Sequence, residues 1–199
     1  MSDSIDLRRR HVIDAAIGVF LRYGYARTTM ADIAEAAGLS RPTLYLTFAD
    51  KEAIFASVIE TMVANKLADI HQGLPDQRTV AAKLAFACEA WGAEGFDLVR
   101  AHPDAKDMFD LGFAAVCASY RAFGALVADI VAGPISAGNL AVDKDELARV
   151  VVYGIKGFKD VARDGQDLRK MIAALVAVVA AALEPEAATR EAGPAGDDP

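Results

Sequence analysis

The chain of 199 residues carries a formal net charge of −7, and 54% of its residues are apolar. This apolar share supports a buried core and excludes global disorder. Taken alone, the acidic balance argues against a nucleic-acid-binding protein. Two cysteines are too few for a secreted disulfide scaffold, and no apolar run follows the charged first ten residues. We therefore expect a soluble, cytosolic protein without an export signal.

The distribution of charge along the chain removes the objection to nucleic-acid binding. Residues 1–51 hold seven Lys or Arg against six Asp or Glu, whereas residues 52–184 hold thirteen against eighteen. Three of the basic residues, Arg8, Arg9 and Arg10, are adjacent. They are interpreted equally as phosphate contacts or as the solvated start of a helix. The acidic character thus belongs to the larger C-terminal part.

The first third of the chain predicts four helices. Apolar residues at helical spacing predict a helix from Leu7, and Gly24 suits the position just past its end. Thr29 is a predicted N-cap with Asp32 completing a capping box, and Gly38 ends that short second helix. Ser40 is the predicted N-cap of the third helix, which has Pro42 in its first turn, and Asp50 is the predicted N-cap of the fourth.

The rest of the chain is also helical by pattern, and its abundant alanine favours helix. We expect helices near 79–100, 104–131, 144–163 and 167–183, and allow a break in the second near Gly112. Glycine and proline predict interruptions at 73–75, 102–103, 133–139 and 164–165. After Pro185 the composition is Ala, Gly, Pro and acid, which predicts a disordered tail over 185–199.

The segment 28–48, TTMADIAEAAGLSRPTLYLTF, predicts a helix-turn-helix. Two short amphipathic helices flank Gly38, which supplies a positive φ at no steric cost. This geometry places a second helix in the DNA major groove. The outer face of that helix offers donors for phosphates and base edges, namely Ser40, Arg41, Thr43, Tyr45 and Thr47. Thr29, with the N–H groups of its helix, and Lys51 add two further anion contacts.

Residues 15–55 resemble the N-terminal domain of the TetR family of bacterial regulators, without a gap. The matching residues are Ala15, Ala16, Phe20, Gly24, Tyr25, Thr28, Thr29, Ile33, Ala34, Ala37, Gly38, Ser40, Thr43, Leu44, Tyr45, Phe48, Lys51 and Glu52. The resemblance implies an all-α homodimer whose head binds a palindromic operator on double-stranded DNA and whose body binds an effector. It also implies that Thr29, Tyr45 and Lys51 contact phosphates.

The same resemblance implies that Arg41, Pro42 and Thr43 face base edges. Two residues depart from the family pattern: Pro42 stands where many members have Gly, and Thr47 where His or Tyr is common. The DNA bases that other family members contact therefore cannot be carried over to this chain. The family plan further implies a four-helix dimer interface made by the last two helices, about 144–183. The helix at 167–183 is nearly all apolar on more than one face, which burial against a partner explains.

Large side chains cluster in the predicted body and suggest a pocket for a small apolar or amphipathic effector. The candidate lining residues are Phe86, Trp91, Met108, Phe113, Tyr120 and Phe123. Ordinary core packing is the competing interpretation for each of them. The acidic body weakly disfavours a strongly anionic effector. Cys88 and Cys117 lack an adjacent cation in sequence, so they are interpreted as inert, and the scattered histidines predict no metal site.

Together these patterns predict an all-α protein with a three-helix helix-turn-helix head on a larger antiparallel helical body. The expected domains are a DNA-binding domain at 7–51 and an effector-binding and dimerisation domain at 52–184. The leading hypothesis is a transcriptional repressor that a small molecule releases from its operator. A ligand-independent regulator, or an activator controlled by a protein partner, stays open. An enzyme with a vestigial head is the third alternative, although no catalytic motif or cofactor site is found.

Overall fold

The computed structural model describes the backbone of residues 2–136 and 141–183, with side chains from Ile5 onward. Within those ranges the protein is all-helical, as expected. The order is α1 (Ser2–Arg27), α2 (Met30–Ala36), α3 (Arg41–Thr47), α4 (Lys51–Gly73) and the 3₁₀ turn η1 (Leu74–Asp76). It continues with α5 (Val80–Ala101), the 3₁₀ helix η2 (Pro103–Phe109), α6 (Ala114–Ser136), α7 (Lys144–Val161) and α8 (Gly165–Leu183).

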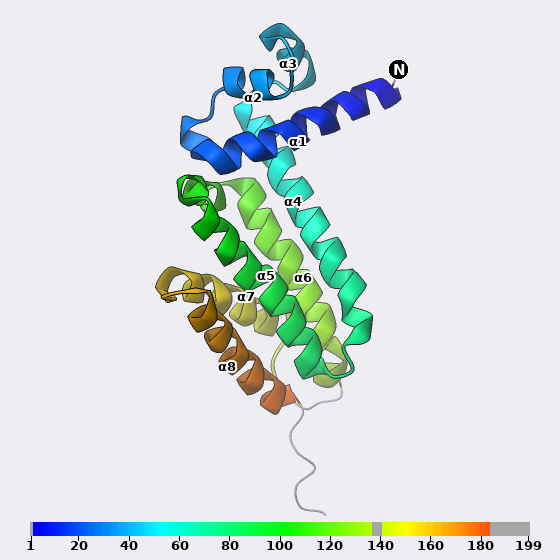
Figure 1. Cartoon of the computed structure of the whole chain (residues 1–199). Helices are drawn as coiled ribbons and strands as arrows, with labels where there is room; N and C mark the ends of the chain where they lie inside the picture. Colours follow the sequence, from blue (N-terminus) through cyan, green and yellow to red (C-terminus); the bar gives the residue numbers. More distant parts are fainter. Residues whose placement is uncertain (1, 137–140, 184–199) are drawn as a thin grey trace, which may run out of the picture.

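The helices form a small head at one end of an elongated body (Figure 1). The helix α1 crosses that end, and α2 and α3 lie on its far side from the body. The long α4 runs from the head along the body beside α5 and α6, and α7 and α8 cover the opposite side. The helix α3 is therefore at the tip of the molecule, remote from α7 and α8.

Local sequence explains the helices of the head. Thr29 caps α2 in a full capping box with Asp32, Ser40 caps α3 by accepting from the backbone N–H of Thr43, and Asp50 caps α4. These three predictions are confirmed. The helix α1 starts earlier than predicted and is kinked at Gly24, where φ is +75° and ψ is 169°, before a last turn to Arg27.

The predicted helix at 104–131 is broken, as allowed, but its first part is a 3₁₀ helix. Asp110 accepts a hydrogen bond from the N–H of Gly112 at 2.7 Å and so turns the chain between η2 and α6. The predicted interruption at Gly133 and Pro134 is wrong, because α6 continues to Ser136. Pro134 removes one hydrogen bond in the last turn, where the helix is about to end anyway. The predicted tail at 185–199 lies outside the described residues.

One continuous core joins head and body. In the head it consists of buried residues from all three helices, including Phe20, Ile33 and Leu44. In the body the central helix is α6, which packs against α4, α5 and α7. By length and composition α6 is apolar enough to cross a membrane. Its buried residues, Phe123 and Val127 among them, belong to the core.

Candidate nucleic-acid interface

The turn between α2 and α3 orients α3. Gly38 has φ +62°, and the N–H of Leu39 donates to the carbonyl of Ala34 at 2.9 Å, which closes the end of α2. Leu44 is fully buried against the head, and Phe48 is 2% exposed. These anchors direct the opposite side of α3 outward.

The outward side of α3 presents a mixed polar and apolar surface. Arg41 and Pro42 are exposed, Tyr45 is 47% exposed and Leu46 is 85% exposed. Arg41 makes no ion pair within the described residues. Sequence reasoning missed Leu46, although the inward spacing of Leu44 and Phe48 already directs position 46 outward. A side chain of this kind suits apolar contact with the methyl group of thymine.

The hydroxyls predicted to contact DNA are already bonded within the head. The Thr29 hydroxyl donates to Oδ2 of Asp32 at 2.7 Å, and the backbone N–H of Thr29 donates to the same oxygen at 2.8 Å. These two hydrogen bonds hold the pKa of Asp32 below its usual value. The hydroxyls of Ser40 and Thr43 lie 2.7 Å apart. The hydroxyl of Thr47 donates to the carbonyl of Thr43 at 3.2 Å. For all four residues the DNA contact stays a prediction.

Lys51 is directed into the protein. Its Nζ donates to the carbonyl of Tyr25 at 2.7 Å and to that of Thr28 at 2.8 Å, and it lies 4.2 Å from the centre of the Tyr25 ring. An ammonium has three donors, so one is left for a phosphate. The side chain therefore ties the start of α4 to the end of α1, and its predicted phosphate contact remains a prediction.

The three adjacent arginines, Arg8, Arg9 and Arg10, lie in different surroundings. Arg9 donates from Nη1 to the carbonyl of Thr47 at 3.2 Å, and its guanidinium lies 4.2 Å from the centre of the Phe48 ring. Arg9 therefore fastens α1 to the end of α3. Arg8 and Arg10 are exposed on α1 and free to meet phosphates.

A second set of contacts joins the head to the body at η2. The carboxylate of Asp107 accepts from the backbone N–H of Tyr25 at 2.9 Å and from that of Ala26 at 2.8 Å. Gly24 is packed so closely here that a Cβ would lie 2.2 Å from the carbonyl oxygen of Asp104. Phe113 adds a ring contact to Tyr25 at 4.6 Å between centroids. The end of α1 is thus held by backbone and carboxylate contacts from η2 and by an aromatic contact from Phe113, in the turn that follows it.

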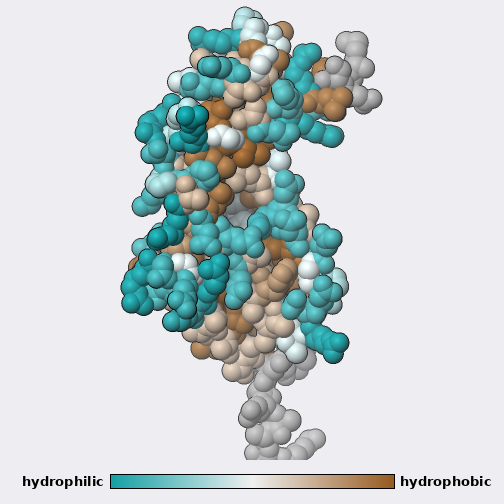
Figure 2. Space-filling view, in the orientation of Figure 1, coloured by the Kyte–Doolittle hydropathy of each residue, from teal (hydrophilic) through white to brown (hydrophobic). Residues whose placement is uncertain are grey.

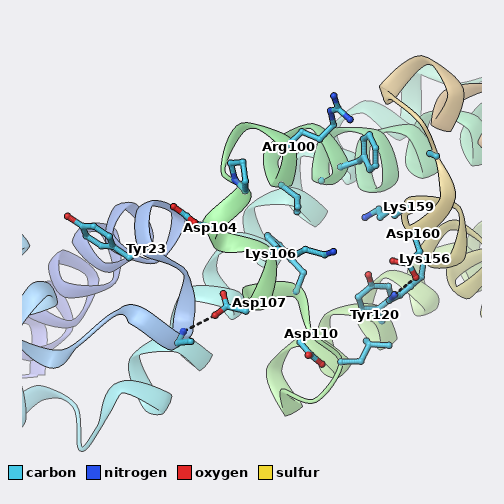
Figure 3. Close-up of a pocket in the computed structure, with 18 of the residues that line it drawn as sticks. Tyr23, Arg100, Asp104, Lys106, Asp107, Asp110, Tyr120, Lys156, Lys159 and Asp160 are labelled. Atoms are coloured by element: carbon cyan, nitrogen blue, oxygen red, sulfur yellow. Dashed lines mark hydrogen bonds and ion pairs between the residues drawn. The ribbon is translucent and has the colours of Figure 1, made fainter.

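A cleft of about 1290 Å³ opens beside this junction, between the end of α1, α5, η2, α6 and α7 (Figure 3). Of the six residues predicted to line a pocket, only Tyr120 is on its wall. Phe113 packs at the junction, Trp91 stacks on Phe123 with centroids 4.5 Å apart, and Met108 is fully buried. Phe86 packs against Gly73. For these five the structure shows core packing.

The cleft wall includes charged residues that sequence reasoning missed, among them Lys106, Lys156 and Lys159. Their helices are far apart in sequence, so no local pattern signals that they meet. Burial lowers the pKa of Lys159, and nearby Lys156 adds to this effect, so that the pKa is about 8. Burial likewise raises the pKa of the Tyr120 hydroxyl to about 12.

Potential metal ligands and the two cysteines are scattered in the part of the chain that the structure describes. Those residues contain no cluster of three or more His, Cys, Asp or Glu side chains that could hold a metal ion. Cys88 is buried, and that burial raises the pKa of its thiol to about 12, which disfavours the reactive thiolate. Cys117 is half-buried, and its thiol donates to the carbonyl of Leu111 at 3.0 Å.

Comparison with known proteins agrees with the geometry of the head. Residues 12–58 match the pattern of bacterial regulatory proteins of the tetR family. The transcriptional repressor ComR of Escherichia coli is 38% identical over 55 residues, which are 28% of this chain and 26% of ComR. The transcriptional activator FasR of Mycolicibacterium smegmatis is 34% identical over 95 residues, 48% of this chain and 42% of FasR. The matched segment thus spans less than half of the length of each relative.

The whole described fold has solved counterparts. The regulator FadR of Bacillus subtilis, solved in complex with stearoyl-CoA, superposes with a TM-score of 0.63 over 87% of this chain and 98% of that one, at 19% identity. At this identity the likeness shows a shared fold alone. All three of these proteins are named as transcriptional regulators. The head, residues 12–58, thus matches the tetR family of bacterial regulatory proteins, and the described chain shares the fold of FadR.

Proposed function

We propose that the protein is a cytoplasmic, sequence-specific transcriptional regulator that binds DNA as a homodimer through α3. The observation that carries this proposal is the outward side of α3, which leaves Arg41, Tyr45 and Leu46 exposed at the tip of the molecule. A helix presented in this way fits the major groove, while α2 crosses the backbone. Regulation by a small molecule in the body, with repression as the default state, is the finer part of the proposal.

Individual contacts follow from exposure and donor type. Arg41, Pro42 and Thr43 are proposed to face base edges, with Leu46 beside them as an apolar contact. Thr29, Ser40 and Tyr45 are proposed to contact phosphates, together with the remaining donor of Lys51. Thr47 is the weakest member of the set, because its hydroxyl is bonded to its own helix.

Arg41→Ala is expected to weaken operator binding about 10- to 100-fold, because each dimer loses two guanidinium contacts to DNA. Binding is measured by fluorescence anisotropy on a labelled duplex from upstream of the gene, at several salt concentrations. The matched control is Arg78→Ala, which removes an exposed arginine at the far end of the body. Equal affinity of wild type and Arg41→Ala across the salt series would count against α3 as the reading helix.

The dimer is proposed to form through α7 and α8. On α7 the exposed residues Val150, Tyr153 and Val161 follow helical spacing, with exposed fractions of 61%, 46% and 68%. On α8, Val178 is 70% exposed and is flanked by exposed alanines at 174, 177 and 181. Figure 2 shows the resulting apolar surface at the lower end of the body, over the C-terminal half of α8. Small residues let helices approach closely, so a second copy of the same surface fits this stripe.

The body, residues 52–184, is proposed to regulate the head, residues 7–51, through η2. The 3₁₀ helix lines the cleft with Lys106 and holds the end of α1 with Asp107. A ligand that shifts η2 therefore shifts the heads of a dimer relative to each other. The recognition helices then no longer match successive major grooves, and operator affinity falls.

Asp107→Asn is expected to loosen the junction without unfolding the body. An amide has one acceptor oxygen for the two backbone N–H groups, so one hydrogen bond to a charged acceptor is lost, at a cost of about 1.5–3 kcal/mol. Hydrogen exchange should become faster in peptides over residues 20–30 and stay unchanged over α8. Asp129→Asn, on the exposed side of α6, is the control. Unchanged exchange over residues 20–30 would show that Asp107 does not hold the head.

An activator is the second candidate, because FasR, which matches the longest segment of this chain among the relatives described above, is named as an activator. In vitro transcription from the regulated promoter separates the two directions. Added protein lowers transcript yield from a repressed promoter and raises it from an activated one.

A further inference from the structure

The cleft beside η2 is lined by five Lys or Arg side chains and four Asp side chains. All four of the carboxylates are engaged. Asp104 pairs with Arg27 at 2.6 Å, and Asp160 pairs with Lys156 at 2.8 Å. Asp107 and Asp110 accept from backbone N–H groups.

Three cations of the cleft have no carboxylate partner within the described residues: Arg100, Lys106 and Lys159. Arg100 donates to the carbonyl of Arg163 at 3.4 Å. The cleft wall thus has a small excess of positive charge in a body whose sequence is acidic.

Lys159 is the half-buried member of these three cations, whereas Arg100 and Lys106 are exposed. Its Nζ has one protein contact, the carbonyl of Trp91 at 3.5 Å, the outer limit of a hydrogen bond. Burial of the amine, with nearby Lys156 adding to the effect, lowers its pKa to about 8. A half-buried ammonium without an ion pair is costly for the protein alone, and a bound anion would reduce that cost.

The cationic side chains converge. In Figure 3 the amines of Lys106, from η2, and Lys159, from α7, point toward the same space, and the hydroxyl of Tyr120 faces it from α6. The rest of the wall near this point includes the apolar side chains of Phe96, Val99, Phe109 and Leu111. The cleft therefore offers donors and charge at Lys106, Lys159 and Tyr120, and apolar surface on Phe96, Val99, Phe109 and Leu111.

We propose that the effector of this protein is an amphipathic small-molecule anion whose carboxylate lies between Lys106 and Lys159, with its apolar body along Phe96 and Phe109. This inference rests on the proposed function, because it names the ligand class of the same effector cleft. It also replaces the expectation that the acidic body disfavours an anion, since average charge does not describe one cleft. Lys106 lies next to Asp107, so the anion would act directly on the element that holds the head.

The proposal is tested with a matched series of probes: octanoate, 1-octanol and octylamine. Binding to the full-length protein without DNA is measured by calorimetry and by the fluorescence of Trp91, the single tryptophan of the chain. We expect octanoate to bind at least about tenfold tighter than the other two, because an anion between two ammonium groups forms hydrogen bonds to charged partners.

Variants identify the groups that recognise the anion. Lys159→Met removes the ammonium but keeps most of the unbranched side chain, and should weaken octanoate binding about tenfold or more while leaving 1-octanol binding within about twofold. Lys106→Gln, on the exposed side of η2, provides the same test if the first variant folds poorly. Lys83→Gln, on α5 outside the cleft, should match wild type.

The pH dependence of octanoate binding gives a second readout. Affinity should fall about tenfold between pH 7 and pH 9, because the ammonium of Lys159 loses its proton as the pH rises through its lowered pKa. The other titratable or charged groups on the cleft wall are Tyr23, Arg27, Arg100, Asp104, Lys106, Asp107, Asp110, Tyr120, Lys156 and Asp160. Lys159→Met leaves all of these in place, so a pH dependence that disappears in this variant belongs to Lys159.

Octanoate binding that is absent, no tighter than 1-octanol binding, or equally strong in Lys159→Met would overturn the proposal. Because these measurements contain no DNA, such a result leaves the DNA-binding function untouched. Failure of that function would appear instead as an Arg41→Ala variant that binds the operator as wild type does.

Discussion

Val178→Glu is expected to convert the dimer to a monomer and to weaken operator binding about 100-fold or more, because one head alone loses the effective concentration that the second supplies. Val178 lies at the centre of the exposed apolar stripe on α8 and is 70% exposed in the single chain. In the proposed interface it faces the partner, where a carboxylate would be buried without a counter-ion. In the isolated chain the same carboxylate stays in water, so the fold of the monomer is preserved.

Sedimentation velocity measures the oligomeric state, and anisotropy on the operator duplex measures the affinity. Gln72→Glu is the matched control, because it adds the same charge at an exposed position of α4 away from the stripe. A Val178→Glu protein that stays dimeric and binds the operator as tightly as wild type would place the interface elsewhere.

Gly24→Ala is expected to destabilise the protein by about 3–5 kcal/mol, through backbone strain and a steric clash that add together. The φ of +75° with ψ of 169° is a conformation reserved almost entirely for glycine. A Cβ there would also lie 2.2 Å from the carbonyl oxygen of Asp104 and 2.7 Å from the carboxylate of Asp107. Relief requires that η2 move away from the end of α1, which breaks the junction.

Two glycine variants separate the causes of this loss. Gly38→Ala has a positive φ of +62° but no neighbour within 4 Å, so it carries strain alone and should cost about 1–2 kcal/mol. Gly18→Ala, in the middle of α1 with free space around it, should be neutral or stabilising. The free energies of unfolding come from urea denaturation followed by circular dichroism. If Gly24→Ala loses no more stability than Gly38→Ala, the close packing of η2 is not what restricts this position.

The head was predictable from sequence because its signals are local. Thr29, Ser40 and Asp50 cap helices that begin at the next residue, and Gly38 marks a turn that needs a positive φ. Each of these features depends on a few neighbouring residues. Their order along the chain matches a known motif, so the fold of the head followed without any long-range contact.

The cleft was not predictable in the same way. Aromatic side chains such as Phe113 and Trp91 can pack in a hydrophobic core or line a pocket, and only the packing of the helices distinguishes the two cases. Lys159 lies on an amphipathic helix where a lysine ordinarily faces solvent, and its burial follows from the position of α7 relative to α5. The helical continuation past Pro134 was missed for a simpler reason, because proline near a helix end costs little.

The measurement that tests the central claim most directly is selection of bound sequences from a library of random DNA duplexes by the wild-type protein. A dimer that reads DNA with two α3 helices predicts a two-fold symmetric site whose half-sites are centred about 10 base pairs, or a multiple of that, apart. Arg41→Ala should lose the preference at defined positions of both half-sites. Recovery of no enriched sequence, or of an asymmetric site that Arg41→Ala selects equally well, would contradict the proposed function.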